Sequence, residues 1–582
     1  MNINTALKTL AIPVFAFSLP LHATVPATSG VATITKIGST SFQVGASFTS
    51  ESDLRLRPSL EMDHSFQKGG SGSQSPARVP ASHVPKPAGN SIAQAPASLM
   101  SFDGLTVRQQ GLASGFTVEP PDQALAVGQG FVLEGVNLAI TVYDANTGVQ
   151  LTPAVGLNDF FKLSPDAFTS DPKALYDAQT GHWFVTILEI NPSFTAASVL
   201  IAVSQTSDPT GSYNIFALDS TDTATPGCPC FGDQPLIGAD ANGFFVNTNE
   251  FGLSNSAFVG TQIFAVDKAA LAAGSATVNT QSFLLTSNVF PIFFSLQPAT
   301  TPPGGNFMMA QGGTEFFLGS LDDFNVLTNQ IAVMALTNTG SLPSAPDLHL
   351  QQVMIDSEVY GPPPASQQPL VPVAQYPVLL PLADALRNDP LGTAFGGPFN
   401  EHEELTDSND DRMAQVVFAD GKLFGALDTV VKTEHGPATA GIAWFAVTPK
   451  FDGDTLTAAM ANQGYVSVDG QNVNYPSIGV NAAGKGVMSF TVVGPDFNPS
   501  AAFATFDADV GAGDVQILAA GFRPDDGFTG YAPFGNRVAR WGDYSAAVAD
   551  ENGDIWLATE YIPDKQRLTF ANWGTRISRV TP

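Results

Sequence analysis

Basic residues and cysteines are scarce in this chain. Only 24 of its 582 residues are Lys or Arg, against 53 Asp or Glu, which gives a formal net charge of −29. Because like charges repel, this balance excludes nucleic acid and anionic membrane surfaces from the expected partners. The charge instead favours cations, neutral sugars or basic protein surfaces as partners.

Long apolar runs are missing beyond the N-terminus. The apolar run Leu10–Leu21 follows Lys8 and precedes small residues, with candidate cleavage points after Ala23 and Ala27. The run is too short to span a bilayer, so we predict a secretory signal peptide over residues 1–23. The mature protein is then expected to be secreted or periplasmic, without membrane insertion.

The sequence also lacks the short motifs of several functional classes. It contains no G-x-S-x-G, no H-E-x-x-H, no glycine-rich phosphate loop and no EF-hand-type calcium loop. Its only cysteines, Cys228 and Cys230, flank a single proline. In an exported protein they are candidates for a local disulfide, and a redox switch or a soft-metal site is the alternative.

Residues 24–104 contain few patterned apolar residues after a first strand-like piece. The stretch KGGSGSQSPARVPASHVPKPAGNSIAQAPAS is rich in Gly, Ser, Pro and Ala. Such a composition buries too little apolar surface to offset the entropy of ordering the chain. We therefore predict a low-complexity linker or propeptide here.

From residue 105 onward, short runs of Val, Ile, Phe and Ala alternate with Gly, Asp, Asn and Pro. Long helical periodicity is absent, apart from the brief segments DKAALAAG near Ala270 and PLADALRND near Leu382. Short apolar runs bounded by turn residues are typical of β-strands. This part of the chain is expected to be all-β.

The β-rich part repeats itself. Five segments align on an acidic or amide residue that starts a strand, namely Asp171, Asp233, Asp411, Asn474 and Asp543. Ten residues later each segment has a glycine, namely Gly181, Gly243, Gly421, Gly484 and Gly553. Turn sequences such as Asp-Ala-Asn-Gly suit tight hairpins, so each segment is predicted to be a β-hairpin.

Two weaker copies, PDQALAVGQGFVLEGVN and LQPATTPPGGNFMMAQGG, bring the count to seven, and a third apolar strand follows each hairpin. Small repeated sheets can bury both faces by closing into a ring. We predict a seven-bladed β-propeller of four-stranded antiparallel blades over residues 105–582. A strand within Leu105–Phe116 is expected to complete the last blade, and a Pro-rich loop is expected to be inserted at about 340–408. An eighth, divergent blade in that interval is the alternative.

The repeat resembles the β-propeller superfamily over roughly residues 105–582. The pieces CPCFGDQPLIGADANGFFVNTNEF and RWGDYSAAVADENGDIW are similar to segments of uncharacterised exported bacterial propeller proteins. The resemblance implies fold and export, but no particular chemistry.

Carboxylates recur at two positions of the repeat. In a propeller, the start of the first strand and the end of the second strand lie on the same face near the axis. Four blades have a carboxylate at both positions, and the pairs are Asp171 with Glu189, Asp233 with Glu250, Asp411 with Asp428, and Asp543 with Glu560. We therefore expect these eight side chains to gather on one face of the ring.

Three interpretations of this set are open. Convergent carboxylates suit a hard cation such as Ca²⁺, which takes six to eight oxygen ligands. They also suit acid–base catalysis, for which Asp233, Glu250, Asp543 and Glu560 are the candidates. A structural role, in which each aspartate caps a loop, is the third.

Arginine and tryptophan side chains lie close to the repeat in sequence. The arginines are expected to pair with carboxylates, and the alternative is an anionic ligand; they are Arg412, Arg537, Arg540 and Arg576. The tryptophans are expected to be mostly core residues, and the alternative is a sugar-stacking platform; they are Trp183, Trp541, Trp556 and Trp573.

The function that these features favour is an exported binding protein. It would present an acidic, Ca²⁺-binding face to a carbohydrate or an extracellular protein, and a closed ring favours a monomer. The alternative is a polysaccharide hydrolase or lyase that uses paired carboxylates on the same face. A purely structural matrix role is a third possibility.

Overall fold

The computed structural model describes residues 22–24, 27–43, 48–57, 80–96, 99–287, 292–321, 327–400, 405–535 and 537–582. Most of the predicted signal peptide, residues 1–21, lies outside the described residues. Within them the chain is mostly β-strand with a few short helices, as the repeat predicts.

Most strands belong to antiparallel sets of four that follow one another along the chain. The first strands of the sets are β8 (Ala124–Gly128), β12 (Phe168–Asp177), β16 (Cys230–Ala239), β20 (Gln297–Thr300), β26 (Val416–Ala419), β30 (Asn472–Val480) and β35 (Ala546–Ala549). The second strands are β9 (Phe131–Val136), β13 (His182–Ile190), β17 (Gly243–Gly252), β21 (Thr314–Ser320), β27 (Lys422–Val431), β31 (Lys485–Gly494) and β36 (Ile555–Tyr561). The third strands are β10 (Ala139–Asp144), β14 (Ala197–Ser204), β18 (Phe258–Asp267), β22 (Thr328–Thr337), β28 (Thr439–Asp452), β32 (Phe497–Asp507) and β37 (Gly574–Val580). The fourth strands are β11 (Val155–Gly156), β15 (Ser212–Asp219), β19 (Thr280–Thr286), β23 (His349–Tyr360), β29 (Thr455–Val466), β34 (Val515–Ala519) and β6 (Met100–Thr106).

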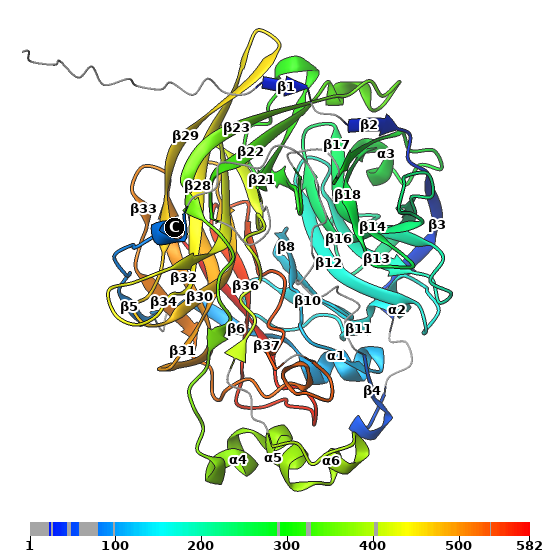
Figure 1. Ribbon diagram of the computed structural model, residues 1–582. Helices are drawn as coiled ribbons and strands as arrows, with labels where there is room; N and C mark the ends of the chain where they lie inside the picture. Colours follow the sequence, from blue (N-terminus) through cyan, green and yellow to red (C-terminus); the bar gives the residue numbers. More distant parts are fainter. Residues whose placement is uncertain are drawn as a thin grey trace, which may run out of the picture.

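The sets stand side by side around a common centre, as in a β-propeller (Figure 1). Each first strand contacts the first strand of the next set, and β35 contacts β8. Separate hydrophobic clusters fill the spaces between successive sheets; for example, the rings of Phe184 and Phe244 stack at 5.0 Å between two of them. A further cluster contains Leu125 and Val132 from the first set with Trp556 and Ile577 from the last. The core is therefore divided among the sheet interfaces.

The strand that completes the last sheet lies earlier than predicted. β6 pairs antiparallel with β37, so that Ile577 faces Phe102. Residues 107–114, which were expected to continue this strand, form helix α1 (Val107–Ser114). The helix begins there because Thr106 and Gln109 form a reciprocal capping box at its N-terminus.

The N-terminal segment is not the linker expected for residues 24–104 where the structure describes it. It runs along the outer edges of several sheets, as β1 (His22–Thr24) on β23, β2 (Ala27–Gly30) on β19, β3 (Ile34–Ser41) on β15 and β5 (Ile92–Gln94) on β34. A shorter strand, β4 (Arg55–Leu56), pairs in parallel with β7 (Phe116–Thr117). Strands at an outer edge are ordered by backbone hydrogen bonds and need few buried side chains, so their composition does not reveal them.

The turn glycines behave largely as the hairpin prediction requires. Gly181, Gly421, Gly484 and Gly553 have φ between 69° and 84°, a region that is unfavourable for other residues. Gly243 differs, since it begins β17 in an extended conformation.

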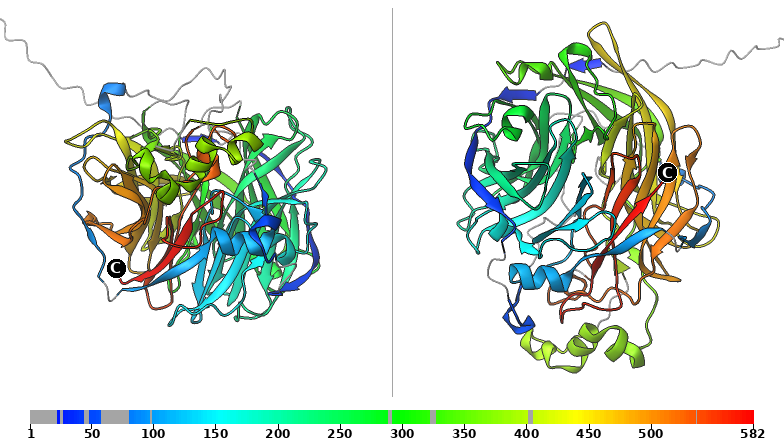
Figure 2. Two further views of the ribbon diagram at one scale, coloured as in Figure 1. Left: turned by 90° about the horizontal axis from the view of Figure 1, so that it is seen from below. Right: turned by 180° about the vertical axis from the view of Figure 1, so that it is seen from behind.

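The irregular interval between the fourth and fifth sets contains more structure than a loop. Its first part is strand β23, which ends at Tyr360, and only then does the chain leave the sheet. The excursion carries helices α4 (Tyr376–Leu379), α5 (Pro381–Asn388) and α6 (Leu391–Ala394), which lie outside the sheets at one end of the molecule (Figures 1 and 2). Strands β24 (Ser366–Gln367) and β25 (Leu405–Thr406) pair at its base.

The remaining elements are short. The helical segment expected near Ala270 is confirmed as α3 (Lys268–Ala272), and the one near Leu382 is confirmed as α5. The others are α2 (Leu157–Phe160), β33 (Gly511–Ala512) and the 3₁₀ turns Glu51–Asp53, Ala81–His83, Ala310–Gly312, Thr339–Ser341, Val373–Gln375 and Phe528–Gly530.

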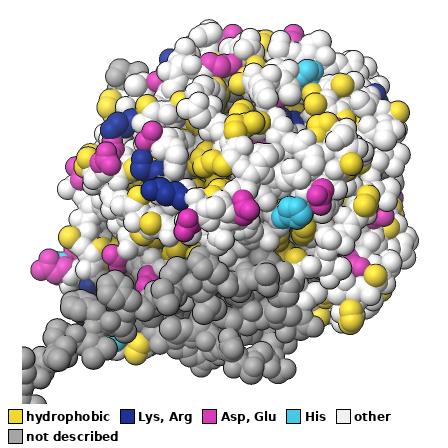
Figure 3. Space-filling view, turned by 90° about the horizontal axis from the view of Figure 1, so that it is seen from above, with side chains coloured by type: hydrophobic (Ala, Val, Ile, Leu, Met, Phe, Trp, Pro, Cys, Tyr) yellow, Lys and Arg dark blue, Asp and Glu magenta, His cyan; other side chains and the backbone are white. Residues whose placement is uncertain are grey.

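The surface shown in Figure 3 is mostly uncharged, with acidic side chains scattered over it and several Lys or Arg side chains gathered in one place. Many carboxylates are instead buried, including Glu119, Glu134, Asp240 and Glu315. Part of the excess of acidic residues therefore lies in the interior of the protein rather than on its surface.

Candidate functional site

The innermost strands begin with an unusual backbone conformation. Asp171, Gln234 and Tyr475 have φ values of 58°, 49° and 57°, and each is followed by a proline and a β-bulge. Asp122, just before β8, has a φ of 47°. A positive φ is uncommon for residues other than glycine, and its repetition at one end of the strands marks a constrained rim.

This geometry corrects the alignment of the repeats. Between the bulge and the turn, β12 has five residues, Lys173–Asp177, whereas β16 has four, Leu236–Ala239. The structural equivalent of Asp171 is therefore Gln234, and Asp233 corresponds to Ser170. Counting back from the turn glycine hides this offset, because the part of β12 between the bulge and the turn is one residue longer than the same part of β16.

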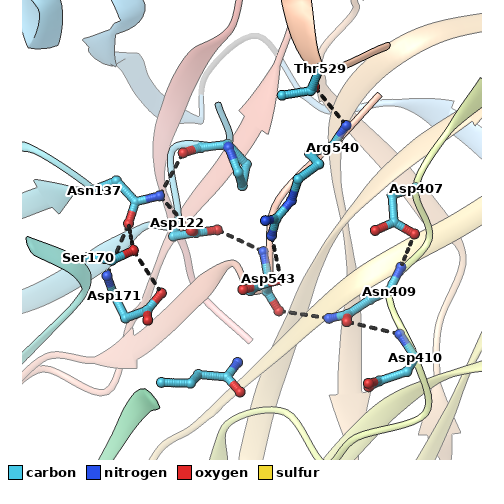
Figure 4. A network of polar contacts seen from close by, with 12 residues as sticks. Asp122, Asn137, Ser170, Asp171, Asp407, Asn409, Asp410, Thr529, Arg540 and Asp543 are labelled. Atoms are coloured by element: carbon cyan, nitrogen blue, oxygen red, sulfur yellow. Dashed lines mark hydrogen bonds and ion pairs between the residues drawn. The ribbon is translucent and has the colours of Figure 1, made fainter. Parts of the chain in front are cut away.

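Three aspartates converge at this rim. Carboxylate oxygens of Asp122, Asp171 and Asp543 lie within 4.8 Å of one another, and all three side chains are buried. Asp122 precedes β8, Asp171 lies at the bulge of β12, and Asp543 precedes β35, so three sheets contribute one carboxylate each (Figure 4). We call this group the aspartate trio.

A single asparagine holds two members of the aspartate trio. The Nδ2 of Asn137 donates to Asp122 Oδ2 at 2.6 Å and to the carbonyl of Pro120 at 2.7 Å. Its Oδ1 accepts from the backbone N–H of Asp171 at 3.0 Å and from the hydroxyl of Ser170 at 3.2 Å. Asn137 is thereby fixed in orientation, and it fixes both aspartates.

The third member is tied to the first through the backbone. The N–H of Asp543 donates to Asp122 Oδ1 at 2.7 Å, and the Nδ2 of Asn409 donates to the Asp543 carbonyl at 2.9 Å. The guanidinium of Arg540 lies 3.4 Å from Asp543 Oδ1 (Figure 4). These contacts fix the Asp122 carboxylate and the backbones that carry the Asp171 and Asp543 side chains.

Asp171 has an oxygen without a hydrogen-bond partner. Its side chain is 0% exposed; Oδ1 accepts a long, 3.4 Å bond from Ser170, and Oδ2 accepts none within the described part of the chain. A buried carboxylate oxygen without a partner is costly, and native structures rarely leave one unexplained. A bound cation would remove that cost.

The electrostatics of the aspartate trio also favour a bound cation. Burial, followed by the neighbouring carboxylates, raises the pKa of Asp171 well above its usual range. Burial and the charge of Asp543 raise the pKa of Asp122 to about 8. Lys173 has its pKa lowered to about 7 by burial, against the pull of the three aspartates, and its Nζ lies 2.7 Å from the centre of the Tyr544 ring. Without a metal, these shifts in pKa favour the protonated forms of Asp122 and Asp171.

A cavity adjoins the aspartate trio. It runs between the innermost strands with an empty volume of about 800 Å³, and most of its wall is small and apolar. Gln123, Lys173 and Ser545 line it, and each lies one or two residues after a member of the aspartate trio. A ligand in this cavity would therefore meet the site at its polar end.

The eight carboxylates predicted to share one face are not equivalent in the structure. Six are buried, namely Asp171, Glu250, Asp411, Asp428, Asp543 and Glu560. Asp171 and Asp543 meet in the aspartate trio, and Asp233 is a nearby charge that helps to raise the pKa of Asp171. Glu189 is partly exposed and is not a member of the aspartate trio.

The remaining predicted carboxylates are held by separate contacts. Glu250 accepts from the hydroxyl of Thr248 at 2.7 Å, and burial raises its pKa to about 8. Asp428 accepts from the backbone N–H of Tyr475 at 2.9 Å, and burial raises its pKa well above the usual range. Burial likewise raises the pKa of Glu560, with the charges of Asp525 and Asp122 adding to the effect.

Asp122 was missed by the sequence analysis, although a signal for it was present. The weak first repeat begins Pro-Asp-Gln, and the third begins Gly-Asp-Gln at Asp233. The shortened turn of the first repeat places Gly130 only eight residues after Asp122, which removes it from an alignment based on glycine spacing.

The arginines, tryptophans and cysteines have structural contacts. The expected pairing of arginines with carboxylates is confirmed for Arg412 with Asp410 at 2.7 Å and Arg576 with Asp103 at 2.6 Å. Four of the tryptophans are core residues, as expected; they are Trp183, Trp541, Trp556 and Trp573. Cys228 and Cys230 form a disulfide.

No protein-family model matches the chain, and no curated protein matches it. Among solved structures, it is similar to a phage phi92 endosialidase with a TM-score of 0.31 and 8% identity, over 83% of this chain and 69% of the other. The PL25 ulvan lyase, a polysaccharide lyase, has a TM-score of 0.30 and 11% identity, over 85% and 94% of the two chains. A Trypanosoma rangeli sialidase in complex with sialic acid has a TM-score of 0.32 and 9% identity, over 78% and 60%. Because these scores are low, we argue the function from this chain's own residues.

Within the described residues, no helix is both long enough and apolar enough to cross a membrane.

Proposed function

We propose that this chain is an exported, seven-bladed β-propeller that binds a divalent cation at its inner rim and, through it, a carbohydrate. Seven blades are supported by the order of contacts among the first strands and by the hydrophobic cluster that joins the first and last sets. A ring closed by β6 leaves no long free edge, which favours a monomer. Export is supported by the composition of residues 1–23, with the secreted or periplasmic location that follows.

Cation binding rests on one observation. Three buried carboxylates from three sheets converge within 4.8 Å, and Asp171 Oδ2 lacks a hydrogen-bond partner. Burial and the neighbouring carboxylates raise the pKa of Asp122 to about 8 and that of Asp171 well above its usual range, which favours their protonated forms. A dication would displace the protons and restore the ionised state.

Calcium fits the donor set better than softer metals. Carboxylate oxygens are the ligands that Ca²⁺ prefers, and three carboxylates can supply up to about six of its six to eight positions. No histidine or cysteine belongs to the group. Hydroxyl oxygens of a neutral sugar entering the adjoining cavity could fill the positions that remain.

Burial favours binding over catalysis. Of the proposed acid–base candidates, Glu250, Asp543 and Glu560 are all buried, and Glu250 is already hydrogen-bonded within its own strand. A hydrolase or lyase needs its acid and base within hydrogen-bond reach of the substrate. The aspartate trio, in contrast, would contact the ion directly, and a sugar would reach that ion from the adjoining cavity.

Calorimetric titration of chelator-treated protein with CaCl₂ tests the proposal. We expect the wild type to bind one Ca²⁺ per chain, and Asp171→Asn to lose at least about tenfold in affinity because one of three ligand charges is removed. The metal-free Asp171→Asn protein should also melt at a higher temperature than the metal-free wild type, since a buried ionisable group beside other carboxylates is replaced by a neutral amide.

The matched control is Glu189→Gln, which changes a predicted site carboxylate that lies apart from the aspartate trio. It should leave Ca²⁺ affinity unchanged. Absence of Ca²⁺ binding by the wild type, or equal affinity in Asp171→Asn, would remove the cation from the proposal. A panel of neutral oligosaccharides with and without Ca²⁺ then tests the second ligand, for which binding without Ca²⁺ dependence would contradict presentation through the ion.

A further inference from the structure

A second pocket lies where the N-terminal segment meets the first sheets. It has an empty volume of about 570 Å³ and is bordered by Arg55 and Arg57, with Phe48, Phe116 and Leu138 among its apolar walls. The parallel pairing of β4 with β7 places both arginines there, because Arg55 pairs with Phe116 in register. The site is independent of the aspartate trio and of the proposed calcium function.

Among the described residues, Arg57 contacts aromatic rings and no carboxylate. Its guanidinium carbon lies 5.2 Å from the centre of the Phe116 ring and 4.4 Å from that of Phe168. Its one hydrogen bond to a described residue is a long contact of 3.4 Å from Nη2 to the carbonyl of Ala167. Burial, with the charge of Arg55, lowers the pKa of Arg57 to about 10.

Arg55 shares the same aromatic surface. Its guanidinium carbon lies 4.4 Å from the centre of the Phe116 ring, and its Nη1 lies 3.7 Å from Asp166 Oδ1. Both members of that ion pair are mostly exposed, so the interaction is weak. Asp159 is the one carboxylate among the lining residues, so the pocket wall has two positive charges and one negative charge.

Several other partly buried arginines among the described residues have carboxylate partners. Arg412 pairs with Asp410, Arg567 with Asp526, and Arg576 with Asp103. A half-buried guanidinium has five N–H donors, and leaving them without an acceptor is costly. Two like charges beside one ring add to that cost. The arrangement is explained if an anion occupies the pocket.

We propose that this pocket binds an oxyanion group, a carboxylate or a sulfate, carried by a ligand with an apolar or sugar-ring body. The planar guanidinium of Arg57 can hold such a group by two parallel hydrogen bonds, and Arg55 adds a second charge. Phe48, Phe116 and Leu138 provide the surface for the body of the ligand. The net charge of −29 repels anions elsewhere on the protein, so binding here would be specific to the site.

The test uses the full chain and defined probes. Wild-type protein is titrated by calorimetry with inorganic sulfate, glucuronic acid, glucose 6-sulfate and, as an uncharged control, glucose. We expect binding of one or both charged sugars and none of glucose; preference for glucuronic acid or for glucose 6-sulfate identifies a carboxylate or a sulfate as the natural group. Arg57→Lys should weaken that binding at least tenfold, because an ammonium cannot form the paired hydrogen bonds. Arg55→Ala should also weaken it at least tenfold, because the second positive charge is removed.

Arg523→Ala is the matched control. Arg523 also stacks on a phenylalanine, Phe522, and donates to one carbonyl, that of Val378, but it lies outside the pocket. Its replacement should leave binding unchanged. Absence of binding of every charged probe to the wild type, or equal binding by wild type and Arg57→Lys at unchanged melting temperature, would overturn the proposal. Binding of inorganic sulfate with neither charged sugar would reduce the site to an adventitious ion only, which also overturns it.

Discussion

Replacing Glu134 with alanine is expected to lower the free energy of unfolding by about 3–5 kcal/mol. Glu134 lies on β9, and its buried Oε2 accepts from the backbone N–H of Leu105 at 2.8 Å and from the hydroxyl of Tyr143 at 2.9 Å. Its Oε1 contacts the hydroxyl of Thr575. The side chain thus joins the first sheet to β6 and β37 of the last sheet. Its loss would leave the Leu105 N–H and the Tyr143 hydroxyl buried without an acceptor. Equilibrium denaturation in urea measures the change.

The same residue predicts a pH dependence with a definite sign. Burial raises the pKa of Glu134 to about 7 in the folded protein, from 4.5 for an ordinary glutamate. Between pH 4.5 and 7 the folded state keeps a proton that the unfolded chain loses, so stability falls as the pH rises. The loss from this group is about 1.4 kcal/mol per pH unit and about 3 kcal/mol in total, and it is complete above pH 7.

Glu134→Gln separates these two effects. A glutamine can accept from Leu105 and Tyr143 through its oxygen and donate to Thr575 through its amide, as a protonated glutamate would; Thr575 in turn donates to the Leu105 carbonyl at 3.0 Å. We therefore expect this variant to be at least as stable as the wild type at pH 8, with the decline between pH 4.5 and 7 reduced by the share of Glu134. Glu551→Ala, which changes an exposed glutamate at a turn, should cost less than about 1 kcal/mol. An alanine variant as stable as the wild type at pH 8 would show that Glu134 does not hold the first and last sheets together.

The hairpins could be predicted from the sequence because each one carries its own turn signal. The alternation of apolar residues and the turn glycines are local, and the structure contains hairpins at all five strong repeats. The strands of the N-terminal segment could not be predicted in this way. β3 is exposed along most of its length and is ordered by the edge of β15, which lies far away in the sequence. Pairing with the edge of a distant strand therefore cannot be predicted from the composition of the segment that pairs.

The sequence indicated that carboxylates gather at the start of the innermost strands, but it did not identify all of the residues that form the site. Asp171 and Asp543 were identified because acidic residues recur at the start of innermost strands, and that much is a property of the repeat. Asp122 escaped because its hairpin has a shorter turn. Glu189 pairs with Thr169 as Glu250 pairs with Gly232, so it does occupy the repeated position, but it is partly exposed whereas Glu250 is buried. Burial was not foreseen either, since a rim of carboxylates was expected to face solvent, whereas Asp122 and Asp171 are both 0% exposed.

Replacing Lys268 with methionine is expected to cost about 3–5 kcal/mol of unfolding free energy. Lys268 begins α3 and is 1% exposed. Its Nζ lies 3.0 Å from Asp177 Oδ1 and donates to Gln179 Oε1 at 2.9 Å and to the Asp240 carbonyl at 2.6 Å. The ammonium therefore joins the ends of β12 and β16, the first strands of neighbouring sheets. Methionine has similar length but would leave the buried Asp177 carboxylate without its cation.

A double variant shows whether the stability lost in Lys268→Met comes from the uncompensated charge of Asp177 or from the lost hydrogen bonds of the ammonium. Lys268→Met combined with Asp177→Asn removes both charges, so it should recover most of the stability that Lys268→Met loses, because a buried ion pair contributes little beyond compensating its own desolvation. Lys36→Met is the control, since its ammonium also donates to a backbone carbonyl, that of Gly274, but is exposed. If the double variant were as unstable as Lys268→Met, the hydrogen bonds to Gln179 and Asp240 would be the contacts that hold β12 against β16. Neighbouring sheets at this position would then be joined by hydrogen bonds to the ammonium rather than by its charge.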